Sequence, residues 1–324
     1  MHITMRSRLI RTTATLAAGA VALVVTVVAA AAQKPYGFAT LPPGTLNYNT
    51  ASAVAKVLKD KGNLNVLVQP TAGDQVIVPM VGRGEVEIGI SNAMEVHDGY
   101  EKEGFKDLRI IGAAHALRVG FFVRKDSGMT KVADLRGKRV PTGFSAMRAL
   151  EPTVRAILAT AGLTEKDIEP VLVPNVVRSA DDFASGAADC FYFAFGAPKV
   201  REVDATTGGI RMVEIDPAGM DAARKIEKWG YLSKVSPGPA FVGVEHPMYV
   251  YSFDNLLFTN AKTPDEFVYR VLDGLLKNKD DLVQLQPVLR EFSAQFAYKQ
   301  YDVPYHSGAL KYFKEHNIAP QALQ

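Results

Sequence analysis

Short apolar runs alternate with helix-like segments along most of the chain. The strand-like runs lie at residues 64–70, 86–91, 108–114, 119–124, 138–142, 169–174 and 188–195. Helical patterns separate several of them, most clearly at residues 50–62 and 151–163, and from about residue 264 to 324 the pattern is mostly helical. This alternation predicts an α/β fold in which helices cover parallel sheets.

One pattern occurs twice. The segment "GRGEVEIGIS" (82–91) and the segment "ASGAADCFYFAFG" (184–196) each combine glycine, acidic residues and an apolar strand, and each follows a helical segment. Glycine often ends a helix before a strand, so chance is one explanation. The other is two similarly built lobes. Ligands in open α/β sheets bind beyond the carboxyl ends of strands; the first copy delivers Ser91 and Asn92 there, and the second delivers Phe195 and Gly196.

The first 32 residues form a predicted export signal. Arg6, Arg8 and Arg11 precede an uncharged run from Thr12 to Ala32, which ends in three alanines before Gln33. Small residues at that place are typical of a cleavage site. Cleavage near Ala32 would release the protein into the periplasm. The alternative is a retained membrane anchor, because the run is about long enough to span a bilayer at ~20 residues.

Charge and composition exclude some functions. The 324 residues carry 37 basic and 34 acidic side chains, so removal of the three arginines of the signal leaves 34 of each. A neutral body argues against a nucleic-acid partner. Cys190, the single cysteine, lies in an apolar run, which predicts a buried residue and no internal disulfide. No metal-binding motif or dinucleotide fingerprint is present, so we expect neither metal nor cofactor.

Residues 143–146, Gly-Phe-Ser-Ala, resemble most of the G-x-S-x-G motif of serine hydrolases. Met147 occupies the position where that motif needs glycine, which counts against nucleophilic catalysis by Ser145. Capture of an anion is the other function that fits. Thr142 and Ser145 precede a helix whose free N–H groups favour negative charge, and Arg148 adds a cation. The simpler alternative, that Ser145 caps a turn and Arg148 is solvated, stays open.

Three other turns supply candidate contacts. In "QPTAGDQVIV" (69–78), Thr71 and Gly73 are candidates for ligand contact, and Asp74 is a candidate helix cap. Asn92, three residues before Glu95, resembles a capping box and could also reach a ligand. The turn in "PPGTLNYNTASAVAKVL" (42–58) presents Asn47 and Tyr48. The candidate ligand-binding residues are therefore Asn47, Tyr48, Thr71, Gly73, Asn92, Thr142, Ser145, Arg148, Phe195 and Gly196.

In this order the turns resemble the TAXI family of solute-binding proteins of tripartite (TRAP) transporters. The segment "VQPTAGDQVIVPMVGRGEVEIGISNAMEVHDGY" is similar to the family pattern "QPTGGS…GEADLG", and "PYHSGALKYFKEHNI" is similar to "HPGALRYYKE". "DLRGKRV" and "RAILATAGL" flank the Ser145 loop as the family pattern requires. The resemblance covers residues 40 to 318.

The resemblance implies a type II periplasmic binding protein with a ligand cleft between two α/β lobes. Lobe I would contain residues 33–120 and 248–324, lobe II residues 121–247, and the crossing strands would lie near 118–124 and 248–258. Such a protein is not an enzyme. It would act as a monomer that delivers a small organic acid or amino acid to an ion-gradient-driven TRAP permease. A periplasmic sensor for a membrane kinase is an alternative that uses the same closure.

One departure from the family concerns the ligand. Where the family commonly has Gly-Ser-Gly-Thr, this chain has Met147, Arg148, Ala149 and Leu150. The loop is bulkier and more basic, which favours a larger or more anionic solute. The glycine-containing turns near Gly44, Gly73 and Gly143 each precede a helix and favour an anion, so we expect a small carboxylate ligand that Arg148 helps to select.

Overall fold

The computed structural model describes residues 35–323, so the predicted signal segment lies outside the described residues. Ten strands are present in this part of the chain: β1 (Tyr36–Thr40), β2 (Val66–Pro70), β3 (Ile88–Asn92), β4 (Leu108–Arg124), β5 (Arg139–Thr142), β6 (Glu169–Leu172), β7 (Cys190–Ala194), β8 (Ile210–Met212), β9 (Tyr231–Val235) and β10 (Met248–Asn260).

The α-helices of the described residues cover these strands. They are α1 (Leu46–Asp60), α2 (Asp74–Gly82), α3 (Ala93–Glu101), α4 (Leu150–Ala159), α5 (Val176–Ala184), α6 (Pro198–Thr206), α7 (Met220–Arg224), α8 (Asp265–Lys277), α9 (Lys279–Leu285), α10 (Ala294–Ala297) and α11 (Ser307–Glu315). Between residues 35 and 323, no helix combines the length and apolar character needed to cross a membrane.

The main sheet is mixed, which corrects the expectation of parallel sheets. Its strands run in the order β2-β1-β3-β10-β4-β7, with β8 beside β4 and β9 beside β10. Strands β1, β2 and β3 are parallel, but β10 is antiparallel to β3, β4 and β9, and β4 is antiparallel to β7 and β8. A separate parallel pair joins β5 to β6. The sequence pattern missed β1, β8 and β9.

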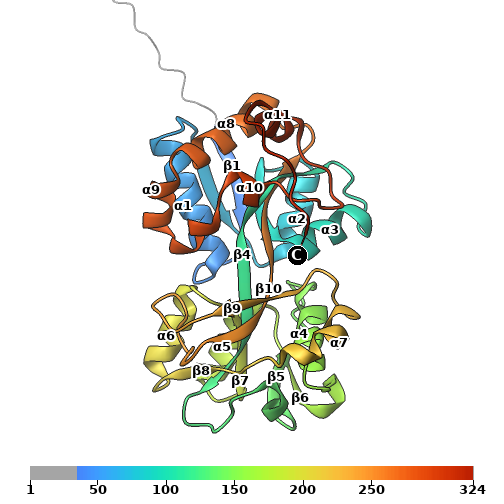
Figure 1. Cartoon of the computed structure of the whole chain (residues 1–324), viewed down its shortest axis with the longest axis vertical. Coiled ribbons are helices and arrows are strands. Elements are labelled where there is room, and N and C mark those ends of the chain that lie inside the picture. The colour runs from blue at the N-terminus through green and yellow to red at the C-terminus, as the bar shows by residue number, and fades with distance from the viewer. Residues whose placement is uncertain (1–34, 324) are drawn as a thin grey trace, which may run out of the picture. The chain divides into compact units, whose positions relative to one another are not determined.

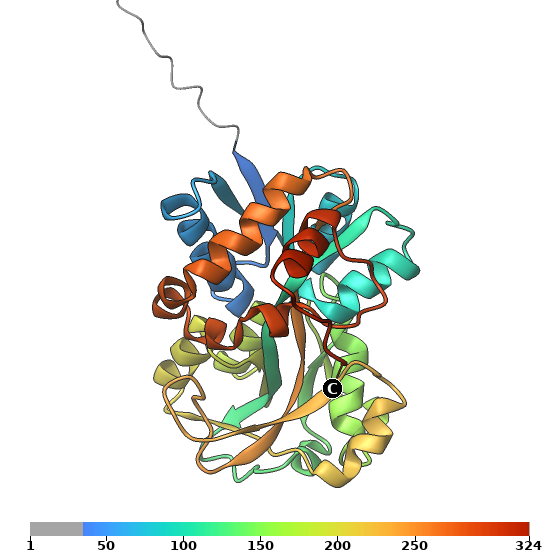
Figure 2. The ribbon, with the colours of Figure 1, turned by 45° about the horizontal axis from the view of Figure 1, so that its top comes forward.

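Two long strands connect an upper and a lower lobe (Figures 1 and 2). The upper lobe contains β1–β3, α1–α3 and α8–α11, and the lower lobe contains β5–β9 and α4–α7. In the upper lobe β4 packs against α10, and in the lower lobe it pairs with β7 and β8. In the same way β10 pairs with β3 in the upper lobe and with β9 in the lower lobe. The α/β, two-lobed class is therefore confirmed, and the lobe boundaries at residues 120 and 247 stay a prediction.

A single strand, β4, replaces two strands of the sequence prediction. The apolar pattern predicts two separate runs, 108–114 and 119–124, with His115 and Arg118 between them. His115 is fully buried, and its ring contacts the Thr50 hydroxyl at 3.4 Å and the Asn255 amide at 3.2 Å. These partners allow a polar side chain inside the sheet. Burial also lowers the pKa of His115 to about 4, which keeps the ring neutral.

The duplicated sequence pattern has a common structural role in both lobes. In the upper lobe the Glu87 carboxylate accepts a hydrogen bond from the Gly37 N–H, where β1 begins, at 2.7 Å. In the lower lobe the Asp189 carboxylate accepts one from the Arg139 N–H, where β5 begins, at 2.8 Å. Each carboxylate lies just before a strand, β3 or β7, and ties it to the start of another strand, β1 or β5. Cys190, at the start of β7, is fully buried as predicted.

Candidate functional site

Two cavities lie on opposite faces of β4, beside the connection between the lobes. Ala116 and Arg118 line the larger cavity, whereas Leu117 and Val119 line the smaller one. Successive side chains of a strand point to opposite faces, so the strand itself separates the two cavities. Their linings share no residue.

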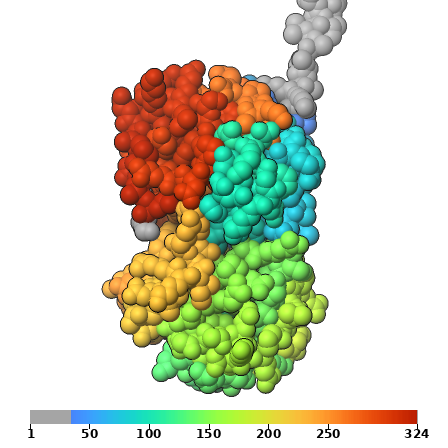
Figure 3. All heavy atoms as spheres, turned by 90° about the vertical axis from the view of Figure 1, so that its right-hand side faces the viewer, coloured from blue at the N-terminus to red at the C-terminus, as the bar shows by residue number. Residues whose placement is uncertain are grey.

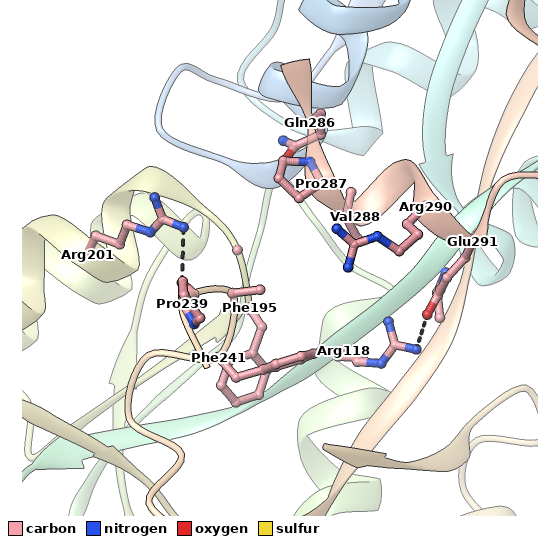
Figure 4. Close-up of a pocket in the computed structure, with 13 residues that line it drawn as sticks. Arg118, Phe195, Arg201, Pro239, Phe241, Gln286, Pro287, Val288, Arg290 and Glu291 are labelled. Carbon is pink, nitrogen blue, oxygen red and sulfur yellow. Dashed lines mark hydrogen bonds and ion pairs between the residues drawn. The ribbon is translucent and has the colours of Figure 1, made fainter. Parts of the chain in front are cut away.

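The larger cavity, which we call the arginine pocket, has a volume of about 430 Å³ and contains three arginines (Figure 4). Arg118 comes from β4, Arg201 from α6, and Arg290 from the short 3₁₀ helix Pro287–Glu291 that follows α9. The lower lobe also contributes Phe195, Gly196 and the loop 239–241, while the upper lobe contributes residues 286–291. Both lobes therefore form its walls.

The charge of the arginine pocket is positive. Glu291 is its only carboxylate among the described residues; it pairs with the Arg118 guanidinium and accepts a 3.3 Å hydrogen bond from the Ala116 N–H. The Arg201 guanidinium donates to the Pro239 carbonyl at 3.1 Å. Arg290 makes no ion pair with any residue between 35 and 323. Three cations and one anion leave a net charge of +2, and guanidinium groups match the geometry of carboxylates and phosphates.

The smaller cavity, which we call the acidic cavity, is lined by Thr45, Asn47, Asp74, Asn92 and Tyr192, and its other lining residues are hydrophobic. Its volume is about 40 Å³. Asp74 is 1% exposed, and its Oδ1 accepts a 2.5 Å hydrogen bond from the Ser91 hydroxyl. Burial raises the pKa of Asp74 to about 6.

Next to the acidic cavity, direct contacts join the two lobes. The Glu95 carboxylate of α3 accepts a 2.9 Å hydrogen bond from the Ala149 N–H at the start of α4 and a 3.1 Å hydrogen bond from the Gln75 amide. Burial, followed by the charge of Asp74, raises the pKa of Glu95 to about 8. Seen from this side, atoms around α2 and α3 lie against the green atoms of the lower lobe (Figure 3).

Four of the ten predicted site residues line a cavity. Asn47 and Asn92 line the acidic cavity, and Phe195 and Gly196 line the arginine pocket. Asn47 pairs with Asn255, whose side-chain amide N–H donates to the Oδ1 atom of Asn47 at 3.0 Å. Asn92 caps α3, as predicted, by accepting from the Glu95 N–H at 2.9 Å.

The other six line neither cavity. The Thr71 hydroxyl lies 3.1 Å from the carbonyl oxygens of Thr40 and Gly73, and Thr142 is buried at the end of β5. Ser145 and Arg148 are exposed. Tyr48 is half-buried in the first turn of α1, and Gly73 lies against Ala146 of the opposite lobe.

Two local expectations change. Asp74 was expected to cap α2, but the cap residue is Gly73, and the Asp74 side chain turns inward to Ser91 instead. Glu95 does not complete a capping box with Asn92, because its carboxylate reaches the Ala149 N–H. As for the hydrolase alternative, no hydrogen bond joins Ser145 to a histidine within residues 35–323.

The sequence reasoning missed Arg118, Arg201 and Arg290. They lie on three elements that are distant along the chain, and none belongs to a turn motif. The polar Arg118 inside an otherwise apolar strand was the one available signal.

This architecture is that of a periplasmic binding protein. It is similar to PhnD1 from Prochlorococcus marinus (MIT 9301), solved with methylphosphonate, with a TM-score of 0.55, 13% identity, and coverage of 88% of this chain and 98% of that chain. The chain matches the model of the NMT1-like family over residues 38–316 and belongs to that family.

Two further structures show weaker similarity. One is the alkanesulfonate-binding protein SsuA from Xanthomonas axonopodis pv. citri bound to MOPS, with a TM-score of 0.48, 15% identity, and coverage of 79% of this chain and 81% of that chain. The other is the substrate-binding protein of an amino acid ABC transporter, with a TM-score of 0.48, 13% identity, and coverage of 78% and 97%.

Proposed function

We propose that this protein is a periplasmic solute-binding protein that captures a small organic anion, a carboxylate, in the arginine pocket and delivers it to a membrane permease. The observation that carries the proposal is the pocket itself: three guanidinium groups and one carboxylate around about 430 Å³ of space between two lobes. That volume falls within the usual range for small-molecule sites, roughly 300–1,000 Å³.

The walls of the pocket favour an anion with an apolar part. Phe195 and Phe241 meet edge to face with ring centroids 5.4 Å apart, and prolines 239 and 287 add further apolar surface. Arg118 is held by Glu291 at the base, while Arg201 and Arg290 are exposed at the rim. An anionic head group would meet the arginines as its apolar part covers the rings.

The resemblance of the sequence to the TAXI family supports a TRAP permease as the partner. The resemblance to the TAXI family and the membership of the NMT1-like family both support a role in binding without catalysis. Closure of the lobes around the solute would present the loaded form to the permease, as hinge closure does in binding proteins.

The test is calorimetry on the purified exported protein, freed of bound solute, against aliphatic and aromatic carboxylates, phosphonates, neutral amides and sugars. We expect a carboxylate to bind best. A hydrogen bond to a charged group contributes ~1.5–3 kcal/mol, so Arg290→Gln should weaken binding roughly ten- to a hundredfold. Arg155→Gln, an exposed arginine on α4, is the matched control.

The Arg148→Gln variant tests whether the solute binds in the arginine pocket or at the 142–148 loop, where the sequence predicts its site. If Arg148→Gln weakens binding and Arg290→Gln does not, the solute binds at the 142–148 loop and the arginine pocket is not its site. Preferential binding of sugars or neutral amides would refute the anion proposal altogether.

A further inference from the structure

A loop of the lower lobe, residues 225–230, lies against the upper lobe, and we call it the latch loop. It joins α7 to β9 and carries Trp229, whose ring centroid is 5.2 Å from that of His97 on α3. The centroid of the Trp229 ring is also 6.4 Å from that of Tyr301, in the segment 298–306 that precedes α11. The latch loop therefore contacts the upper lobe at two elements.

His97 is placed in this contact as a neutral ring. Its Nδ1 atom is buried and has no hydrogen-bond partner among residues 35–323. The Asp302 carboxylate is 3.6 Å from Nδ1, which is too far for a hydrogen bond, and the Lys228 ammonium of the latch loop lies 3.5 Å from the same carboxylate oxygen. Lys228 already supplies a cation to Asp302. A protonated His97 would compete with that cation while Trp229 keeps water away from the ring.

Charged groups surround His97 on each element that packs against it. They are Asp98 and Lys102 at the end of α3, Glu227 and Lys228 in the latch loop, and Asp302 in the segment 298–306. Burial, followed by the charge of Lys228, lowers the pKa of His97 below its ordinary 6.5, although Asp98 and Asp302 act in the opposite direction. Because the latch loop supplies Lys228 and covers the ring with Trp229, His97 binds a proton more readily once the loop has left.

We propose that the latch loop is a proton-released latch, which holds the two lobes together while His97 is neutral and leaves α3 when His97 takes up a proton. The latched arrangement binds this proton less readily than the released one, so it loses stability as the pH falls. Release begins below pH 6.5, where a solvated His97 starts to take up a proton. A solute enclosed between the lobes would leave more easily once they separate, a consequence that rests on the proposed function.

Trp229 is the single tryptophan of the 324 residues, so its fluorescence reports on the latch loop alone. The test uses the purified exported protein, freed of bound solute, between pH 7.5 and pH 5. We expect the emission maximum to shift to longer wavelength and quenching by acrylamide to increase as the pH falls, because Trp229 then enters water. The radius of gyration from small-angle scattering should increase over the same range. Circular dichroism at each pH confirms that the chain stays folded.

His97→Phe keeps a ring beside Trp229 but cannot take up a proton, so all three changes should be lost. The buried acids that also have raised pKa values are present in both proteins and cancel in the comparison; they are Asp74, Glu95 and Glu227. His246→Phe makes the same replacement at an exposed histidine of the lower lobe. It is the matched control and should keep the three changes.

Two further variants separate the charge of the latch from its mere packing. Lys228→Gln and Asp302→Asn break the same ion pair, but they change the charge beside His97 in opposite directions. Without Lys228, a protonated ring can pair with Asp302, whereas without Asp302 it faces the ammonium alone. At low ionic strength, where these exposed charges are least screened, the pH midpoint of release should therefore be higher in Asp302→Asn than in Lys228→Gln.

A fall in Trp229 intensity with an unchanged emission maximum and unchanged acrylamide quenching would overturn the proposal, because His97 would then take up its proton with the latch loop in place. A constant radius of gyration, changes that survive in His97→Phe, or equal midpoints in Lys228→Gln and Asp302→Asn would overturn it as well. Failure of every carboxylate to bind would refute the proposed function and leave the latch standing, since this test adds no solute.

Discussion

Replacement of Glu95 by glutamine should make the protein more stable at alkaline pH. Burial, followed by repulsion from Asp74, raises the pKa of Glu95 from 4.5 to about 8. The folded state therefore keeps a proton that the unfolded state has released. Between these two pKa values the unfolding free energy falls as the pH rises, by about 1.4 kcal/mol per pH unit for one proton.

The expected difference between the two proteins follows from that slope. From pH 6.5 to pH 8 the folded state gives up about half of the Glu95 proton, so Glu95 lowers the unfolding free energy by about 1.5–2 kcal/mol. Glutamine cannot ionise, and its carbonyl oxygen can still accept from the Ala149 N–H. Histidines with lowered pKa values, such as His97 and His115, act equally in both proteins and cancel in the difference.

Urea unfolding followed by circular dichroism, at several pH values from 6.5 to 8, measures this difference directly. Glu101→Gln is the matched control, because Glu101 lies on the same helix but pairs with Lys106 at the surface. Its pH profile should run parallel to that of the unmodified protein. A parallel profile for Glu95→Gln as well would refute the reasoning, since Glu95 would then be ionised in the folded state throughout.

Two further predictions concern a buried ion pair and a close contact between the lobes. Lys299 and Asp254 form a buried ion pair at 2.6 Å. Lys299→Met leaves the Asp254 carboxylate buried without its partner, so urea unfolding should show an unfolding free energy lower by about 3–5 kcal/mol. The double variant Lys299→Met with Asp254→Leu removes both charges and should recover part of that loss. A Cβ atom at Gly73 would lie 1.9 Å from the Ala146 carbonyl oxygen of the opposite lobe, so Gly73→Ala should push the lobes apart. The radius of gyration measured by small-angle scattering should then increase. Gly238→Ala is the control, because nothing lies within 4 Å of a Cβ atom there, and it should leave the radius of gyration unchanged.

Local patterns were sufficient for most of the fold. Apolar runs predicted β2, β3, β5, β6 and β7, because each strand is short and is bounded by turns. Long helical runs predicted α1 and α4 to within a few residues at their starts. The mixed character of the sheet could not be predicted, because the pairing of β10 with β3 and β4 joins segments more than 100 residues apart, and nothing in a local pattern states its direction.

The site was harder to predict than the fold, because a cavity depends on which faces of distant elements meet. Turn motifs selected Asn47 and Asn92, which line the acidic cavity, and their contact with a solute stays a prediction. The same reasoning placed Arg148 at the ligand, yet the helix start beside it is already occupied by a carboxylate of the protein, Glu95. Only the tertiary structure shows that a side chain of α3 reaches the Ala149 N–H.

Acidic and basic side chains lie on opposite faces of β4, since Asp74 lines the acidic cavity and three arginines line the arginine pocket. Asp74 is a buried acid on the α4 side of the strand, and its carboxylate, when ionised, would repel an anionic solute from the turns where the sequence predicts the site. Arg118 lies on the other face, where Arg201 and Arg290 also line the arginine pocket. Side chains alternate along a strand, so one residue step from Leu117 to Arg118 is enough to separate the two environments.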